Sequence, residues 1–160
     1  MADNYLEKRY EEVFGKGNVR HPSLPSRASL DKLLLKSGGF RCFDKAYAVH
    51  RIQLEAIVGV NTKVLPGGSV LSLEFRPVTE GENALIVICS SEAETPELYI
   101  RVGASLQAMM LKAADLGLGG MIVHDFDAGD LQVRLDLPCR PLAVLAVGKP
   151  ADKTQSDPRQ

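Results

Sequence analysis

The sequence predicts an α+β domain in which helices cover a central sheet. Helical segments come first, two strand segments and a long helix follow, and a strand, a short helix and a last strand complete the order. Residues 84–89 form a continuous apolar run, which is typical of a strand covered on both faces. The helix predicted over 96–116 is apolar on nearly every side, so it needs either a large core or a partner surface.

Periodicity, caps and glycines define the individual elements. In the N-terminal half, helices are predicted over 4–14, 30–36 and 49–60. Strands are predicted over 71–77, 84–89, 120–124 and 141–148. The long helix has Thr95 as its N-cap, Pro96 at its first position and Gly117 at its end. Asp127 is expected to cap a short helix that ends at Leu135.

The long helix carries one narrow polar stripe. Its members at helical spacing are Arg101, Ser105, Lys112 and Asp115. Gln107 stands alone among apolar positions, either as a satisfied buried amide or as a contact to a partner or cofactor. From the residues alone, the helix fits a monomer core and a dimer interface equally well.

Composition narrows the class of protein. The chain has 160 residues, 45% of them apolar and 24% charged, with a net charge of −1, which suits one globular domain. Lys and Arg are scattered, which argues against a nucleic-acid-binding face. We see no signal peptide and no apolar run long enough to span a membrane. We interpret Cys42, Cys89 and Cys139 as reduced thiols of a cytoplasmic protein rather than a disulfide framework or zinc site.

No self-sufficient catalytic motif is present: GxSxG, HExxH and P-loop patterns are all absent from the sequence. The glycines at 117, 119 and 120 follow a helix and precede a strand, so they indicate a helix end rather than a phosphate-binding turn. His124, Asp125 and Asp127 are the only tight His and carboxylate group, and they are too few for a matched metal site. We therefore predict neither a metal nor a catalytic side chain.

Most of the chain, roughly residues 36–150, resembles the FMN-dependent nitroreductase-like family. The segments that carry the resemblance are 60–64, 75–79, 99–107, 110–119, 126–127 and 145–149. The resemblance implies a central mixed or antiparallel sheet flanked by helices, in an intertwined homodimer with FMN at the dimer interface. It therefore favours the dimer for the apolar helix. From this resemblance and the composition of the two ends, we divide the chain into an N-terminal helix and linker arm (1–28), a nitroreductase-like domain (29–150) and a flexible tail (151–160).

This resemblance also implies an activity. Family members pass a hydride from NADH or NADPH through FMN to a nitro-aromatic, quinone or similar acceptor. Because the flavin performs the redox step, no catalytic side chain is expected. The alternative is a pseudoenzyme with a degenerate flavin site, or a non-catalytic dimeric ligand-binding protein. The expected partners are a second copy of the chain and a small-molecule acceptor, without nucleic acid or membrane.

The expected phosphate contacts lie near both ends of the family-like region. The family's Arg, Arg or His, and Ser positions fall on residues 37–39, beginning with Ser37. Arg41 keeps its basic character, and Lys36 lies one position before the motif, where it can substitute. Lys149, after the last strand, lies near where the family uses a basic residue for the phosphate.

The expected ring contacts come from two loops. In the middle loop, Gly68, Ser69 and Leu71 occupy the family's variable, Asn and Gln positions, so only the Ser69 hydroxyl remains as a polar side chain. In the turn after the long helix and its strand, His124 and Asp125 fall where the family offers a backbone N–H to flavin N5. These residues complete the predicted flavin site.

Overall fold

The computed structural model describes residues 28–38, 42–64, 73–80 and 83–151. The chain divides into two compact units, residues 1–32 and 33–160, and helix α2 (Ala28–Ser37) crosses the boundary between them. The predicted helix 4–14, the loop at 65–69 and most of the tail lie outside the described residues. The predicted arm and tail boundaries therefore stay predictions.

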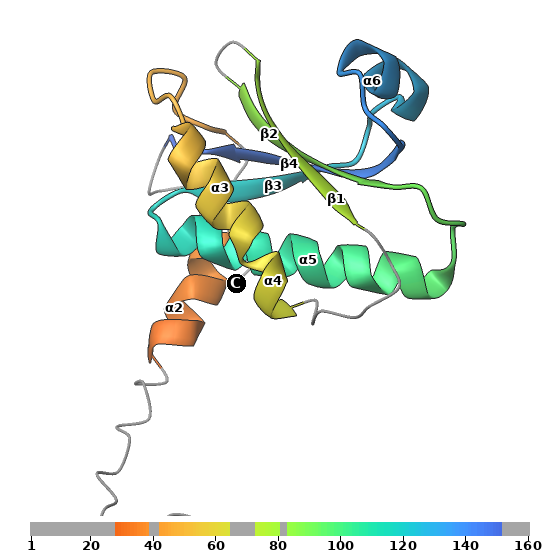
Figure 1. Cartoon of the computed structure of the whole chain (residues 1–160). Helices are drawn as coiled ribbons and strands as arrows, with labels where there is room; N and C mark the ends of the chain where they lie inside the picture. The colour runs from red at the N-terminus through yellow and green to blue at the C-terminus, as the bar shows by residue number, and fades with distance from the viewer. Residues whose placement is uncertain (1–27, 39–41, 65–72, 81–82, 152–160) are drawn as a thin grey trace, which may run out of the picture. The chain divides into compact units, whose positions relative to one another are not determined.

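Four antiparallel strands form the central sheet of the second unit, in the order β1-β2-β4-β3 (Figure 1). They are β1 (Glu74–Glu80), β2 (Asn83–Ser90), β3 (Gly119–Val123) and β4 (Arg140–Gly148). The predicted α+β class with an antiparallel sheet is confirmed. β1 continues beyond the predicted end at Pro77, which pairs with Ile86. Proline has no backbone N–H to donate. It is tolerated here because β1 is an edge strand, and the N–H groups on the outer side of an edge strand pair with no other strand.

Both faces of β2 are covered, as its apolar run predicts. Ala84, Ile86 and Ile88 join the larger core cluster with residues of α3 (Arg51–Gly59) and α5 (Pro96–Asp115). The alternate residues Val87 and Cys89 join a second cluster with Leu131 of α6 (Ala128–Arg134). The short helix α4 (Asn61–Val64) follows α3 and also packs against α5. Figure 1 shows α5 running along the sheet, with α6 standing apart from it.

Helix α5 begins and ends as its sequence predicts. The Thr95 hydroxyl accepts the Leu98 N–H at 3.2 Å, and Pro96 takes the first helical position. Gly117 has a φ of 75°, and the next N–H, from Leu118, reaches back to the Ala113 carbonyl at 2.8 Å. Asp127 likewise caps α6 by accepting the Asp130 N–H at 2.8 Å. The caps therefore determine where α5 ends before β3 and where α6 begins.

The predicted polar stripe of α5 is only partly correct. Arg101 and Lys112 make ion pairs within the helix, with Glu97 at 3.2 Å and Asp115 at 2.8 Å. Ser105, however, is fully buried, and its hydroxyl has no hydrogen-bond partner in the described structure. It lies beside the core-facing side of the helix because it is four residues before Met109, which is also fully buried. Gln107 is exposed, so it is not the satisfied buried amide considered above.

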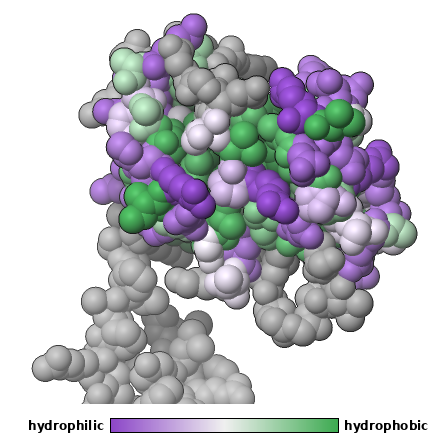
Figure 2. Space-filling view, turned by 45° about the horizontal axis from the view of Figure 1, so that its top comes forward, coloured by the Kyte–Doolittle hydropathy of each residue, from purple (hydrophilic) through white to green (hydrophobic). Residues whose placement is uncertain are grey.

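Apolar side chains also reach the surface. The face in Figure 2 carries hydrophobic areas between hydrophilic side chains. The large apolar residues that are exposed in the second unit include Ile52 at 74%, Ile100 at 71% and Val133 at 83%. Within the described ranges, no helix combines the length and apolarity needed to cross a membrane.

Candidate functional site

The end of β4 is joined to a segment more than a hundred positions earlier in the chain. Phe43 and Pro150 form an antiparallel bridge. The Asp44 N–H donates to the Lys149 carbonyl at 2.7 Å, and the Ala151 N–H donates to the Cys42 carbonyl at 3.2 Å. This pairing fixes the backbone of Lys149 beside residues 42–44.

Lys149 lies in a defined position at this junction. Its Nζ atom is 5.3 Å from the centroid of the Tyr47 ring, within the range of a cation–π contact. Gln53 supports the ring by donating from Nε2 to the Tyr47 hydroxyl at 3.1 Å. Gln53 also accepts the His50 N–H at 2.9 Å at the start of α3. Among the described residues no carboxylate pairs with Lys149, so its charge remains available to an anion.

Lys36 and Ser37 lie in the last turn of α2. Lys36 is exposed. Ser37 is buried, and its hydroxyl donates to the Leu34 carbonyl at 2.9 Å. That bond uses the only hydrogen of the hydroxyl, so Ser37 has no donor left for phosphate oxygens, which mostly need donors. The structure does not connect either residue to Lys149 by any described contact.

The turn after β3 carries His124 and Asp125, and both are exposed. Asp125 therefore presents a carboxylate to solvent at the position where the resemblance expects a backbone donor for the flavin ring. Asp127, two residues after Asp125, caps α6. Across the residues that the structure describes, no group of three His, Cys, Asp or Glu side chains could hold a metal ion.

Four predicted site residues, Arg41, Gly68, Ser69 and Leu71, lie outside the described residues. Their roles stay predictions, although chain connectivity places Arg41 directly before Cys42, which takes part in the junction with Ala151. Sequence reasoning missed Tyr47 and Phe43 as parts of this junction. The signal was weak, because an aromatic residue in a coil segment has no periodicity that assigns it to a distant strand.

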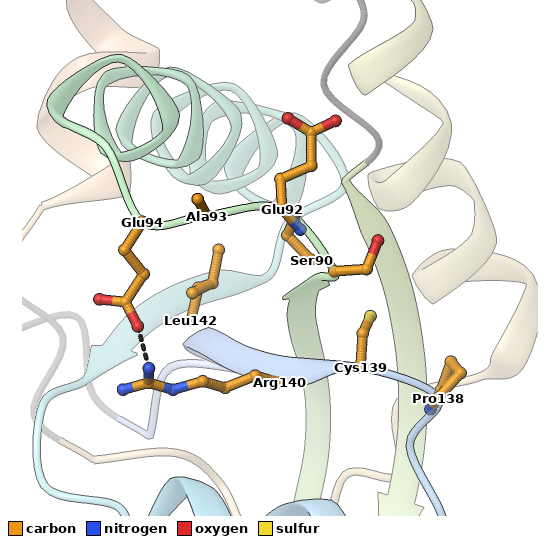
Figure 3. A pocket seen from close by; sticks show the side chains of 9 residues that line it. Ser90, Glu92, Ala93, Glu94, Pro138, Cys139, Arg140 and Leu142 are labelled. Carbon is orange, nitrogen blue, oxygen red and sulfur yellow. Dashed lines mark hydrogen bonds and ion pairs between the residues drawn. The ribbon is translucent and has the colours of Figure 1, made fainter.

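A pocket of about 440 Å³ lies at the opposite end of β4 from Lys149 (Figure 3). Its wall includes Glu94, which forms an ion pair with Arg140 and accepts the Tyr99 hydroxyl at 2.5 Å. None of the predicted flavin-site residues that the structure describes lines this pocket. The pocket is therefore a feature separate from the predicted site.

The side of α5 that faces neither the sheet nor the polar stripe is apolar and exposed. Ile100 is 71% exposed and Tyr99 is 45% exposed. Gly103, Ala104 and Gln107 are exposed on the same side, and a Cβ atom on Gly103 would meet nothing within 4 Å. We refer to Ile100, Gly103, Ala104 and Gln107 as the α5 face. Small residues at its centre would allow another helix to approach closely.

Comparison with known proteins connects this fold to one family. Residues 41–149 match the sequence profile of the Nitroreductase family. Among curated proteins none matches the chain. Several solved structures share the fold.

A nitroreductase family protein from Streptococcus pneumoniae has a TM-score of 0.68 and 14% identity, with 82% of this chain and 95% of that chain covered. The NADPH:FMN oxidoreductase from Vibrio harveyi has a TM-score of 0.66 and 18% identity, with 81% and 72% covered. An FMN-dependent nitroreductase from Clostridium difficile has a TM-score of 0.65 and 14% identity, with 77% and 88% covered. At these sequence identities, the comparison shows that this chain and the three proteins share a fold.

Proposed function

Because the chain belongs to the Nitroreductase family, we propose that it is an FMN-dependent oxidoreductase. It takes a hydride from NADH or NADPH and delivers it to a nitro-aromatic, quinone or similar small-molecule acceptor. Two proteins that share its fold are an FMN-dependent nitroreductase and an NADPH:FMN oxidoreductase, which supports this assignment. We propose that the protein acts in the cytoplasm. None of its described helices is long and apolar enough to span a membrane.

The observation that carries the proposal is the junction at the end of β4. It pairs Lys149 with Asp44 and Ala151 with Cys42, and Arg41 precedes Cys42 in the sequence. We propose that Lys149 and Arg41 together bind the phosphate dianion, since a charge-assisted hydrogen bond contributes about 1.5–3 kcal/mol. The described residues therefore fit the phosphate end of FMN through Lys149, whose charge no described carboxylate neutralises.

Other residues have smaller roles in the proposal. Bound FMN would supply the hydride chemistry. The main chain at His124 and Asp125 would donate hydrogen bonds to the ring, and the loop at Gly68, Ser69 and Leu71 would contact the other ring edge. Lys36 is a further cation for the phosphate, whereas the Ser37 hydroxyl already donates to Leu34.

We further propose that the active form is a homodimer in which two copies of the α5 face pack together. The exposed Ile100 supplies apolar area, and Gly103 and Ala104 let the two helices approach closely. Burying apolar area contributes about 25 cal/mol per Å², so this face alone is small and the rest of an intertwined interface must add to it. In this arrangement FMN would bind between the two copies.

Two observations favour the alternative of a flavin-site-degenerate pseudoenzyme or ligand-binding protein. Ser37 has no free donor, and Asp125 is exposed at the ring-binding turn. A carboxylate near the ring would repel the anionic reduced flavin and so weaken its binding. The alternative predicts the same fold and dimer without retained FMN.

A visible absorption spectrum of the purified protein, before and after adding FMN, separates the two functions. We expect a flavin spectrum that stays with the protein through gel filtration. NADH or NADPH oxidation should then depend on an added quinone or nitro-aromatic. A colourless protein that leaves added FMN free would contradict the oxidoreductase and favour the alternative.

A further inference from the structure

Lys149 and Tyr47 are connected twice, through the main chain and through their side chains. The Lys149 carbonyl accepts the Asp44 N–H at 2.7 Å, and the Asp44 carbonyl accepts the Tyr47 N–H at 3.2 Å. The Nζ atom of Lys149 lies over the Tyr47 ring, 5.3 Å from its centroid. The side chain of Lys149 therefore returns to the same segment that binds its backbone.

The Tyr47 ring is itself held in place. It is partly buried and packs against the larger core cluster. Its hydroxyl accepts a hydrogen bond from Nε2 of Gln53 at 3.1 Å. Gln53 is fixed in turn, because its Oε1 atom accepts the His50 N–H at 2.9 Å at the start of α3. The ring is thus a firm support for Lys149, which is exposed and has a long, flexible side chain.

An aromatic face holds a cation in a different way from a carboxylate. It attracts the ammonium through the ring quadrupole and carries no net charge. A carboxylate partner would instead compete with any anion for the positive charge of Lys149. Asp44 has a carboxylate in the same segment, but its Oδ1 atom accepts the Ala46 N–H at 2.9 Å. Within the described ranges no ion pair joins it to Lys149, so the lysine is restrained without being neutralised.

We propose that Tyr47 is a positioning residue, which holds the Lys149 ammonium in place for the phosphate group of FMN. The role rests on the proposed flavin site. Because the ring already restrains the lysine side chain, less conformational freedom is lost when a phosphate binds. A lysine ammonium has three N–H donors, so those directed away from the ring can bind phosphate oxygens. Tyr47 acts only through Lys149 and is not a catalytic residue.

This role predicts an effect confined to the phosphate end of the ligand. FMN and riboflavin share the flavin ring and the ribityl chain, but only FMN carries the phosphate. Loss of the Tyr47 ring should therefore weaken the binding of FMN and leave that of riboflavin unchanged. A general disturbance of the site would weaken both.

The test compares Tyr47→Leu with Tyr47→Phe in the full chain, by fluorescence titration of FMN and of riboflavin. Leucine keeps an apolar side chain against the core but has no aromatic face, whereas phenylalanine keeps the face and loses only the hydroxyl. From the usual strength of an exposed cation–π contact, Tyr47→Leu should raise the FMN dissociation constant by about two- to fivefold. Tyr47→Phe should stay within about twofold of the natural chain, and neither variant should change the riboflavin dissociation constant.

A double-mutant cycle shows whether Tyr47 acts through Lys149. In a Lys149→Ala background the ring has no cation to hold, so adding Tyr47→Leu should leave the FMN dissociation constant unchanged. The proposal is overturned if Tyr47→Leu alone leaves FMN binding unchanged, weakens riboflavin equally, or still acts in the Lys149→Ala background. It is also overturned if Tyr47→Phe weakens FMN binding as much as Tyr47→Leu, since the hydroxyl rather than the ring would then be responsible.

A flavin-free measurement separates failure of this role from failure of the proposed function. The ring current of Tyr47 should move the NMR signals of the Lys149 Cε protons upfield, and Lys149→Arg identifies those signals. The upfield shift should persist in Tyr47→Phe and disappear in Tyr47→Leu. If FMN binds but the shift is the same in Tyr47→Leu, the positioning role is wrong while the flavin site stands. A natural chain that shows the shift but binds no FMN would overturn the proposed function, and with it the phosphate role of Tyr47.

Discussion

The Phe43 ring packs directly on the Cα atom of Gly148. A Cβ atom added to Gly148 would lie 2.5 Å from Cγ of Phe43, much closer than any real contact. This approach brings the coil at 42–44 onto the end of β4, where the bridge between Phe43 and Pro150 forms. The glycine before Lys149 therefore serves to position the lysine rather than to give the chain an unusual backbone angle.

Gly148→Ala should destabilise the protein because the new methyl group collides with Phe43. Overpacking of this kind costs about 1–3 kcal/mol of unfolding free energy. Urea denaturation followed by circular dichroism measures the change. Gly59→Ala is the control, since a Cβ atom there would meet nothing within 4 Å. Equal stabilities of the two variants would show that the Phe43 contact does not restrict position 148.

Lys149→Ala should lower the affinity for FMN by about ten- to a hundredfold, because a charge-assisted phosphate contact contributes about 1.5–3 kcal/mol. Fluorescence titration of FMN measures the dissociation constant. Lys149→Arg should retain most of the affinity, and Arg41→Ala should weaken it as Lys149→Ala does. Lys45→Ala is the matched control, an exposed lysine on the segment next to the junction. An unchanged dissociation constant in Lys149→Ala would remove Lys149 from the proposed phosphate site.

The fold was predictable from the sequence where local signals agree. Thr95, Pro96 and Gly117 mark the ends of α5 because caps and glycine turns depend on neighbouring residues only. The run at 84–89 indicates a doubly covered strand because apolar residues occupy both faces. The predicted strand ended at Pro77, whereas β1 continues to Glu80, because an edge strand tolerates proline and the edge is known only once the sheet is assembled.

The site was less predictable because it depends on contacts between distant segments. The junction of 42–44 with 149–151 joins two coil segments that have no periodic pattern. Cys89 and Cys139 were interpreted as reduced thiols, and only the folded chain shows that both belong to one core cluster. Ser105 was assigned to the polar stripe from its chemistry, whereas its position beside Met109 buries it.

Ile100→Glu should convert the proposed homodimer into a monomer. A charge buried in the α5 face would lose its hydration without gaining a partner, which is strongly unfavourable. We expect the dimer dissociation constant to rise by at least tenfold in sedimentation equilibrium. Ile52→Glu is the control, because Ile52 is 74% exposed on α3 and is not a member of the α5 face. A natural chain that is already monomeric at micromolar concentration would contradict the dimer itself.

Ser105→Ala should leave the protein equally stable or stabilise it by about 1 kcal/mol. The hydroxyl is buried without a hydrogen-bond partner among the described residues, so removing it relieves a desolvation cost. Alanine also has the higher helix propensity. Thermal unfolding of the two proteins gives the difference. In Asn61→Ala the direction reverses, since Asn61 donates to the Val58 carbonyl at 2.9 Å and that bond is lost. A clear loss of stability in Ser105→Ala would indicate that its hydroxyl is bonded in solution.

The raised pKa of Cys89 should make stability fall at alkaline pH. Burial is the main cause of the rise to about 12, and Cys139 and Glu74 add to it while Arg76 opposes it. Above an unfolded thiol pKa of about 8.5, the unfolded chain releases a proton that the folded chain still holds. The unfolded state then binds fewer protons, so the free energy of unfolding decreases as pH rises, by up to about 1.4 kcal/mol per pH unit for one thiol.

Urea denaturation under reducing conditions between pH 8 and 10 tests this slope. Cys42→Ser should keep it, because Cys42 is exposed. Cys89→Ala should be less stable at pH 7 because of the cavity it leaves, yet its stability should fall less steeply with pH. That combination separates the thiol's titration from its packing, since a cavity lowers stability by the same amount at every pH. Parallel stability curves for Cys89→Ala and the natural chain would mean that the Cys89 thiol titrates alike in the folded and unfolded states.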